Sequence, residues 1–156
     1  GSFREDSGTV DAPIGRHPTD RKKMCVTQRN SKEAVTHWEV VKRYRGYTHI
    51  RCKLETGRTH QIRVHFNWIG HPLFNDSRYD GAEIRKGTIY AKYRQFIENC
   101  FKLLPRQALH AKTLVFVHPK TKQMVRFDSP LPGDMQALID KWRKYSENMT
   151  QFLEEE

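Results

Sequence analysis

The residues best suited to chemistry lie in residues 55–66, where two arginines and a histidine fall in the opening turns of an expected helix. The N-terminus of a helix carries a partial positive charge, so cations there are disfavoured by roughly a few tenths of a kcal/mol. The placement becomes favourable when an anion is held there, because free N–H groups and guanidinium groups then converge on it. The segment therefore predicts an anion site that involves Arg58, His60 and Arg63.

The position of Arg63 on this helix suggests a fixed partner. In the expected helix, residues 59–69, the side chains of Ile62, Phe66 and Ile69 form one apolar stripe. Arg63 lies beside this stripe rather than opposite it, so we expect its side chain to be half-buried and aimed at a fixed acceptor. An internal pair between Arg63 and an acid of the chain, such as Glu55, is the alternative.

Other kinds of chemistry find little support. His60 and His65 are five residues apart, whereas a zinc-binding helix places its histidines four apart with a glutamate between them. No phosphate-binding loop or Gly-x-Gly-x-x-Gly motif occurs, and no histidine forms a recognisable pattern with a cysteine. We therefore expect neither a metal nor a cofactor.

Charge and composition indicate a polyanionic partner. The 156 residues carry a net charge of +10, and residues 16–53 contain eleven Lys and Arg against three acids. Such a one-signed region is typical of nucleic-acid binding, although a solvated basic face would look the same. The three cysteines are far apart and odd in number, which favours a reducing compartment. No apolar run reaches the length of a membrane span, so we expect a cytoplasmic protein without a membrane partner.

The elements that would position these residues are strands and helices of one α+β domain. Residues 35–44 and 47–55 read as a hairpin around Arg45-Gly46, with Thr48, Ile50, Cys52 and Leu54 on the buried face. Short extended pieces between residues 8 and 30 flank a basic loop that contains Pro18. Residues 108–118 and 123–128 form a second hairpin. The expected sheet is mainly antiparallel and mixed, with flanking helices.

Two further amphipathic helices are expected, and their inward residues follow from the helical period. The first covers residues 89–104, after a polar loop at residues 75–88, and the second covers residues 134–145. The inward residues of the two helices are Tyr93, Phe96, Ile97, Cys100, Leu104, Met135, Leu138, Ile139 and Trp142.

Six stretches of the chain resemble the RluA-type pseudouridine synthases. They are residues 8–18, 32–37, 54–65, 70–73, 106–111 and 129–135. The string Glu-Thr-Gly-Arg-Thr-His-Gln-Ile-Arg-Val-His at residues 55–65 is the longest and most specific of them. The resemblance implies a pseudouridine synthase catalytic domain that isomerises uridine in structured RNA, with large-subunit (23S-type) rRNA as the expected substrate, and without cofactor or metal.

One departure from the family pattern concerns the nucleophile. The family attacks uridine with the aspartate of a His-Arg-Leu-Asp motif, and none of the eight aspartates here follows His-Arg-Leu. The resemblance therefore implies that residues 1–156 are a single domain forming the C-terminal portion of the catalytic domain, with the nucleophile-bearing N-terminal portion outside this sequence. We expect the isolated chain to be inactive, and to self-associate through unpaired strand edges.

The resemblance also assigns roles to individual residues. Arg63 matches the arginine that pairs with the catalytic aspartate, which would keep that carboxylate ionised and oriented. The residues expected to contact RNA are Arg16, His17, Arg21, Lys22, Lys23, Arg58, His60 and Gln61. For His60 an interior hydrogen-bonding role is the alternative, and Trp38, Tyr44 and Tyr47 are expected to pack in the core rather than to stack on bases.

Two other functions remain open at this point. The chain would be a non-catalytic RNA-binding module if no nucleophile were supplied to it, or a basic scaffold domain if its partner were a protein.

Overall fold

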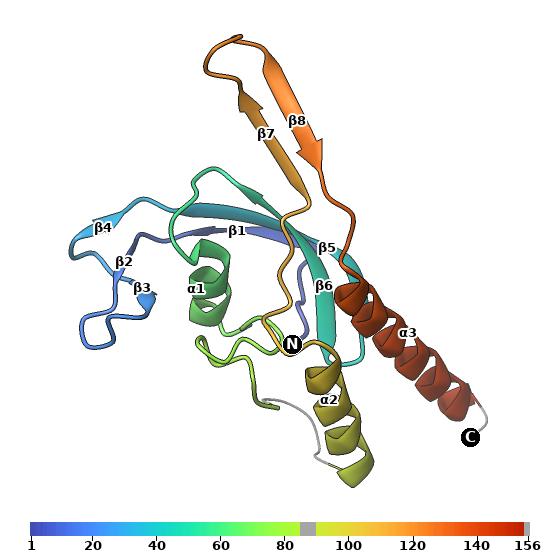
Figure 1. Cartoon of the computed structure of the whole chain (residues 1–156). Coiled ribbons are helices and arrows are strands. Elements are labelled where there is room, and N and C mark those ends of the chain that lie inside the picture. Colours follow the sequence, from blue (N-terminus) through green and yellow to red (C-terminus); the bar gives the residue numbers. More distant parts are fainter. Residues whose placement is uncertain (85–89, 155–156) are drawn as a thin grey trace.

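The computed structural model describes residues 1–84 and 90–154. The last part of the expected polar loop (residues 85–88) and the expected first residue of the following helix (Ile89) lie outside the described residues. Within the described part, the strands form three separate antiparallel sheets with three α-helices beside them (Figure 1). The α+β class with antiparallel pairing is confirmed, although the strands do not join into one sheet.

The central sheet has the order β1-β5-β6, in which β5 pairs with both neighbours. Its strands are β1 (Ser7–Asp11), β5 (Val35–Tyr44) and β6 (Tyr47–Leu54). The β5–β6 hairpin turns at Arg45-Gly46, as predicted, with Gly46 at a φ of 79°. Because glycine has no Cβ and adopts a positive φ at no steric cost, this residue suits the point where the hairpin reverses.

Two smaller sheets flank the central one. The order β3-β2-β4 joins β3 (Met24–Val26) and β4 (Ser31–Lys32) to β2 (Ile14–Arg16), and the expected basic loop connects β2 to β3. The strands β7 (Thr113–Val117) and β8 (Met124–Asp128) form a hairpin that projects away from the rest of the molecule (Figure 1). Residues 108–112 were expected to extend β7 but are not a strand.

The helices differ from prediction mainly at their ends. They are α1 (Gln61–Trp68), α2 (Ala91–Leu103) and α3 (Gly133–Glu154). Helix α1 begins two residues later than predicted because His60 adopts the left-handed conformation, with a φ of 56°. Helix α3 continues well past residue 145, where the expected apolar pattern ended.

The core consists of three clusters of buried side chains, and α1 contributes to two of them. Phe66 packs with Val10 and Trp38 of the central sheet, and Val64 packs with Ile14 of the small sheet. Helices α2 and α3 bury a third cluster around Ile97, Cys100, Leu104, Leu138 and Trp142. Helix α1 is therefore held between two sheets, and this position determines where its arginine points.

The aromatic residues of the β5–β6 hairpin pack in the core, as predicted. Trp38 is buried, and Tyr47 packs on Trp142 with ring centroids 4.3 Å apart. Tyr44 packs against the same cluster. The predicted buried face of β6 is only partly confirmed, because Leu54 at the end of the strand is exposed.

Candidate active site around Arg63

The guanidinium of Arg63 binds a carboxylate of the chain itself. Its Nε donates to Oδ2 of Asp76 and its Nη2 donates to Oδ1, both at 2.8 Å. Asp76 is 1% exposed and the Arg63 side chain is 12% exposed, so the pair is almost entirely buried. The hydrogen bond to Asp76 raises the pKa of Arg63. Arg63 thus has a fixed acceptor, as predicted, but it is more buried than expected and its acceptor is an acid of the chain itself. This is the internal pair that the sequence left as the alternative, formed with Asp76 and not with Glu55.

The loop after α1 presents Asp76 to the arginine through a network of backbone bonds. The N–H groups of Tyr79 and Gly81 donate to the backbone oxygen of Asp76, the second at 2.7 Å. The Asp76 N–H donates to the carbonyl of Leu73. A Cβ at position 81 would overlap that same Leu73 oxygen, so only glycine fits there. Hydrogen bonds within the loop thus fix the backbone of Asp76, and with it the position from which the carboxylate binds Arg63.

Tyr79 connects Arg63 to the small sheet. Its ring lies against the guanidinium, with the Arg63 Cζ 4.8 Å from the ring centroid. Its hydroxyl accepts the N–H of Met24 at 3.0 Å and contacts Nδ1 of His60 at 2.7 Å. The hydroxyl has a proton that it can donate to Nδ1 when a neutral His60 carries its own proton on Nε2. Burial lowers the pKa of His60, and Arg63 adds to that effect.

A buried chain of hydrogen bonds fixes α1 to β5. Nε2 of Gln61 donates to the Thr36 hydroxyl at 2.9 Å, and this hydroxyl contacts Nδ1 of His65 at 2.8 Å. Nε2 of His65 donates to the carbonyl of Ala12 at 2.8 Å. The four residues that form this chain of hydrogen bonds are buried away from water. Their hydrogen bonds to one another replace those that water would make. This chain sets the rotation of α1 and with it the direction of Arg63.

The buried His65 predicts a pH dependence of stability. Burial lowers its pKa below the ordinary value of 6.5, so the unfolded state binds a proton more readily than the folded state. The stabilisation is complete above pH 6.5 and is lost as the pH falls toward the folded-state pKa. We expect the contribution of His65 to the free energy of unfolding, measured with urea, to decrease between pH 7.5 and pH 5.5 by up to about 1.4 kcal/mol per pH unit.

The variant His65→Gln provides the comparison for this prediction. It removes the titrating ring while keeping an amide that can hydrogen-bond, so the variant should be less stable at pH 7.5 but should show a flatter pH dependence. His49 and His60 also have pKa values lowered by burial and would retain part of the slope. An identical slope in both proteins would contradict the assignment to His65.

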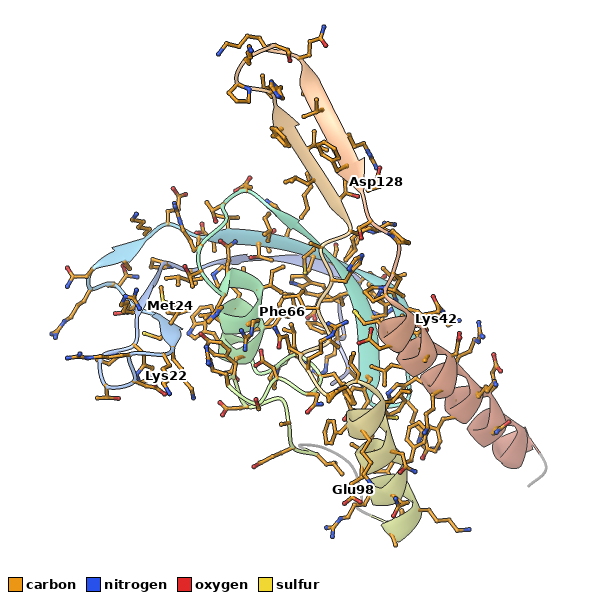
Figure 2. The ribbon with its side chains drawn as sticks, viewed as in Figure 1. Lys22, Met24, Lys42, Phe66, Glu98 and Asp128 are labelled. Atoms are coloured by element: carbon orange, nitrogen blue, oxygen red, sulfur yellow. The ribbon has the colours of Figure 1, made fainter. Side chains whose placement is uncertain are left out.

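The basic residues predicted to contact RNA lie on and next to the loop between β2 and β3. Arg16, Arg21 and Lys22 are exposed, whereas His17 and Lys23 are half-buried. Figure 2 shows Lys22 on this loop at the edge of the molecule, close to Met24 of β3. Nδ1 of His17 accepts the N–H of Asp20 at 3.0 Å, so this ring also stabilises the loop. The loop is therefore an ordered, basic and accessible edge.

The remaining predicted contacts fall into different environments. Nε of Arg58 donates to the Glu33 carbonyl at 2.7 Å, which leaves the rest of its guanidinium at a half-buried position. His60 is half-buried and bound to Tyr79. Gln61 is 3% exposed, and its amide is fully hydrogen-bonded within the protein. Its Oε1 accepts from the Thr56 hydroxyl and the Arg58 N–H, and its Nε2 donates to the Val35 carbonyl and the Thr36 hydroxyl. The Gln61 side chain therefore lies in the core, and its contact with RNA stays a prediction that this burial does not favour.

Asp76 and Tyr79 are the site residues that sequence reasoning missed. Both lie in the segment interpreted only as a polar loop. The expectation of a half-buried arginine implied an acceptor, but several acids were available and sequence distance did not choose among them.

Two further properties bear on the class of site. Among the described residues, no three His, Cys, Asp or Glu side chains gather closely enough to hold a metal ion. None of the helices in residues 1–84 and 90–154 combines the length and apolar character needed to cross a membrane.

Comparisons with known proteins show which proteins the chain resembles. The family model described as RNA pseudouridylate synthase matches residues 2–68, which include the central sheet and all of α1. The predicted resemblance to the pseudouridine synthases is confirmed: the chain is similar to RNA pseudouridine synthases, several of which are named as ribosomal large subunit pseudouridine synthase D.

Individual relatives cover most of this chain. An uncharacterized RNA pseudouridine synthase of Bacillus subtilis is 46% identical over 92% of the chain and 42% of its own length. Ribosomal large subunit pseudouridine synthase D of Nitrosomonas europaea is 48% identical over 89% of the chain and 38% of its own length. The chain thus spans about two fifths of the length of these curated relatives.

Solved structures agree on the fold. Human RNA pseudouridylate synthase domain containing 1 superposes with a TM-score of 0.63 at 26% identity, over 88% of this chain and 54% of that one. A second human protein, domain containing 4, gives a TM-score of 0.55 at 22% identity, over 88% of this chain and 57% of that one, and supports the fold alone.

Proposed function

We propose that this chain is part of the catalytic domain of an RNA pseudouridine synthase that acts on large-subunit rRNA in the cytoplasm. The observation that carries the proposal is the 46–48% identity, over about nine tenths of the chain, to relatives named as pseudouridine synthases. In the proposed reaction the bond between C1′ and N1 of uridine breaks and a bond between C1′ and C5 forms. The hydrogen of C5 is released to solvent and N1 gains a proton.

In this proposal Arg63 binds the nucleophilic aspartate, and that aspartate comes from residues outside this sequence. The guanidinium has donors to spare, because Asp76 uses only Nε and Nη2. A second carboxylate at the guanidinium would be held ionised by the positive charge, which lowers the pKa of a carboxyl group. The basic β2–β3 loop would bind the RNA backbone and stabilise the distortion that brings a uridine out of its stack.

A non-catalytic RNA-binding module is the second candidate, and one observation favours it. Arg63 already has a complete carboxylate partner in Asp76, so its burial is explained without any nucleophile. In such a module the basic β2–β3 loop would bind RNA, and Arg63 would have only a structural role as the partner of Asp76.

Tritium release from RNA that carries 5-³H-uridine separates the two candidates, because only isomerisation displaces the hydrogen of C5. We expect release from a gene product that contains these residues together with a His-Arg-Leu-Asp segment. RNA binding by that protein without release would favour the module. Failure to bind any RNA at any salt concentration would favour a scaffold with a protein partner.

Self-association of the isolated chain is also part of the proposal, and the β7–β8 hairpin is the surface that supports it. Leu114, Phe116, Val125 and Phe127 share one face of the hairpin, and Phe127 is 60% exposed. The ring centroids of Phe116 and Phe127 are 6.1 Å apart. An isolated hairpin is marginally stable in water, so covering this apolar face by a second copy would stabilise it.

Sedimentation of the 156-residue chain tests this surface. We expect a concentration-dependent dimer that Phe127→Lys weakens at least tenfold, because a charge would be buried in the apolar contact. Met124→Lys is the matched control, since Met124 is 74% exposed on the opposite face of the same strand. A monomer at all concentrations, or equal effects of the two variants, would contradict the proposal.

A further inference from the structure

The arrangement around Arg63 leaves one side of the guanidinium unused. The carboxylate of Asp76 occupies Nε and Nη2, and no hydrogen bond among the described residues uses Nη1. The arginine side chain retains 12% of its exposure, whereas Asp76 is almost fully enclosed. The fork of a guanidinium is planar and rigid, so a carboxylate bound on one edge determines where the remaining N–H groups point.

Asp76 is better suited to orienting than to reacting. Its oxygens accept from Arg63 and from the N–H of Tyr79, and its backbone is bound into the turn that closes at Gly81. A carboxylate buried to 1% exposure and held at both oxygens has no path to a uridine. The pair also contributes little net stability as a rule, since burying two charges costs about as much as their attraction returns. We therefore ascribe to the Arg63–Asp76 pair a role in orienting the guanidinium rather than in stabilising the fold.

Tyr79 limits the remaining freedom of the guanidinium. The ring covers one face of Arg63, and the hydroxyl is fixed by Met24 and His60. The guanidinium is thus held along one edge by Asp76 and on one face by Tyr79. Only the Nη1 side remains available to a further group.

We infer that Asp76 is a positioning residue, which orients Arg63 so that Nη1 receives the carboxylate of the catalytic aspartate. This inference rests on the proposed function. The residue concerned, Asp76, lies in the loop that follows α1, whereas Arg63 lies in α1 itself. Displacing a reacting group by about 1 Å costs about a hundredfold in rate, so loss of this orientation should be visible in turnover.

The test uses the active enzyme that contains this sequence and compares it with its Asp76→Asn variant. The amide is nearly isosteric but presents only one acceptor to the two guanidinium donors, so Arg63 should move. We expect kcat for tritium release to fall about tenfold to a hundredfold per folded molecule, while the Kd for the RNA stays within twofold. The acidic limb of the pH–rate profile should also shift, because the variant removes a negative charge beside Arg63 and moves the guanidinium, and both changes alter the pKa of the nucleophile.

Asp134→Asn is the matched control. Asp134, in the first turn of α3, binds Arg106 through the same two-pronged geometry, at 3.2 Å and 3.0 Å, but at a half-exposed position. We expect its loss to change stability without moving the pH–rate profile. Unfolding curves of both variants give the folded fraction that corrects each rate.

Two results would overturn the inference. One is an unchanged kcat and pH profile in folded Asp76→Asn, and the other is an equal loss of RNA binding and turnover. Should Asp76→Asn not fold, Asp76→Glu carries the test, because its longer side chain displaces the guanidinium while keeping the charge. A normal kcat in that variant would also overturn the inference. Absence of tritium release from the unmodified enzyme would instead contradict the proposed function itself.

Discussion

Arg63→Ala in the active enzyme is expected to lower turnover by at least about a hundredfold to a thousandfold and to leave RNA affinity within a few-fold. The reason is that this guanidinium is almost buried beside the carboxylate of Asp76 and, in the proposed function, holds the nucleophile rather than a phosphate. Single-turnover tritium release and a separate measurement of RNA binding distinguish the two effects. Equal losses of binding and turnover would place Arg63 on the RNA instead of the nucleophile.

The same substitution should also destabilise the fold, and a second variant separates that effect from catalysis. Removing the arginine leaves the Asp76 carboxylate buried without its cation, which costs about 3–5 kcal/mol. Arg63→Ala/Asp76→Ala removes both charges and should recover part of that loss in urea unfolding. We expect turnover to remain absent in the double variant. Recovery of turnover together with stability would mean that Arg63 has only a structural role.

Lys22→Ala/Lys23→Ala is expected to give the opposite kinetic signature. Both residues lie on the ordered loop between β2 and β3, where they would meet the RNA backbone, and Figure 2 labels Lys22 there. We expect weaker RNA binding at low salt, with a plot of log affinity against log salt that is flatter by about 0.7–0.9 for each lost phosphate contact. Turnover at saturating RNA should be unchanged.

A charge-matched control makes this measurement specific. Lys92→Ala/Lys102→Ala removes two exposed lysines from α2, on a different part of the molecule (Figure 1). It lowers the net charge by the same amount but should leave the salt slope unchanged. If both double variants flatten the slope equally, or if neither does, the β2–β3 loop is not a specific RNA-binding surface.

Local patterns in the sequence were sufficient for much of the fold. The alternation of residue types and the glycine of the β5–β6 turn predicted both strands, because register and reversal depend on neighbouring residues. The apolar period predicted the inward residues of α2, of which Ile97, Cys100 and Leu104 are fully buried. The stripe on α1 predicted that Arg63 would be partly buried, since its angle from Ile62 and Phe66 follows from the helical period.

The parts that sequence could not predict depend on contacts between distant segments. His60 adopts a positive φ next to Tyr79, nineteen residues away, and this contact accompanies the later start of α1. Gln61 appeared to be a polar residue at the start of a helix, yet tertiary contacts with Val35 and Thr36 bury it. Asp76 became the partner of Arg63 because the loop closes at Gly81, and no local pattern indicates that closure.

The most direct test of the account is tritium release from 5-³H-uridine RNA by two proteins in parallel. One is the 156-residue chain, and the other is a gene product that holds the same residues together with a His-Arg-Leu-Asp segment. We expect release by the longer protein and none by the 156-residue chain, which has no aspartate in that motif. Turnover by the 156-residue chain would contradict the assigned source of the nucleophile, and release by neither protein would contradict the proposed function.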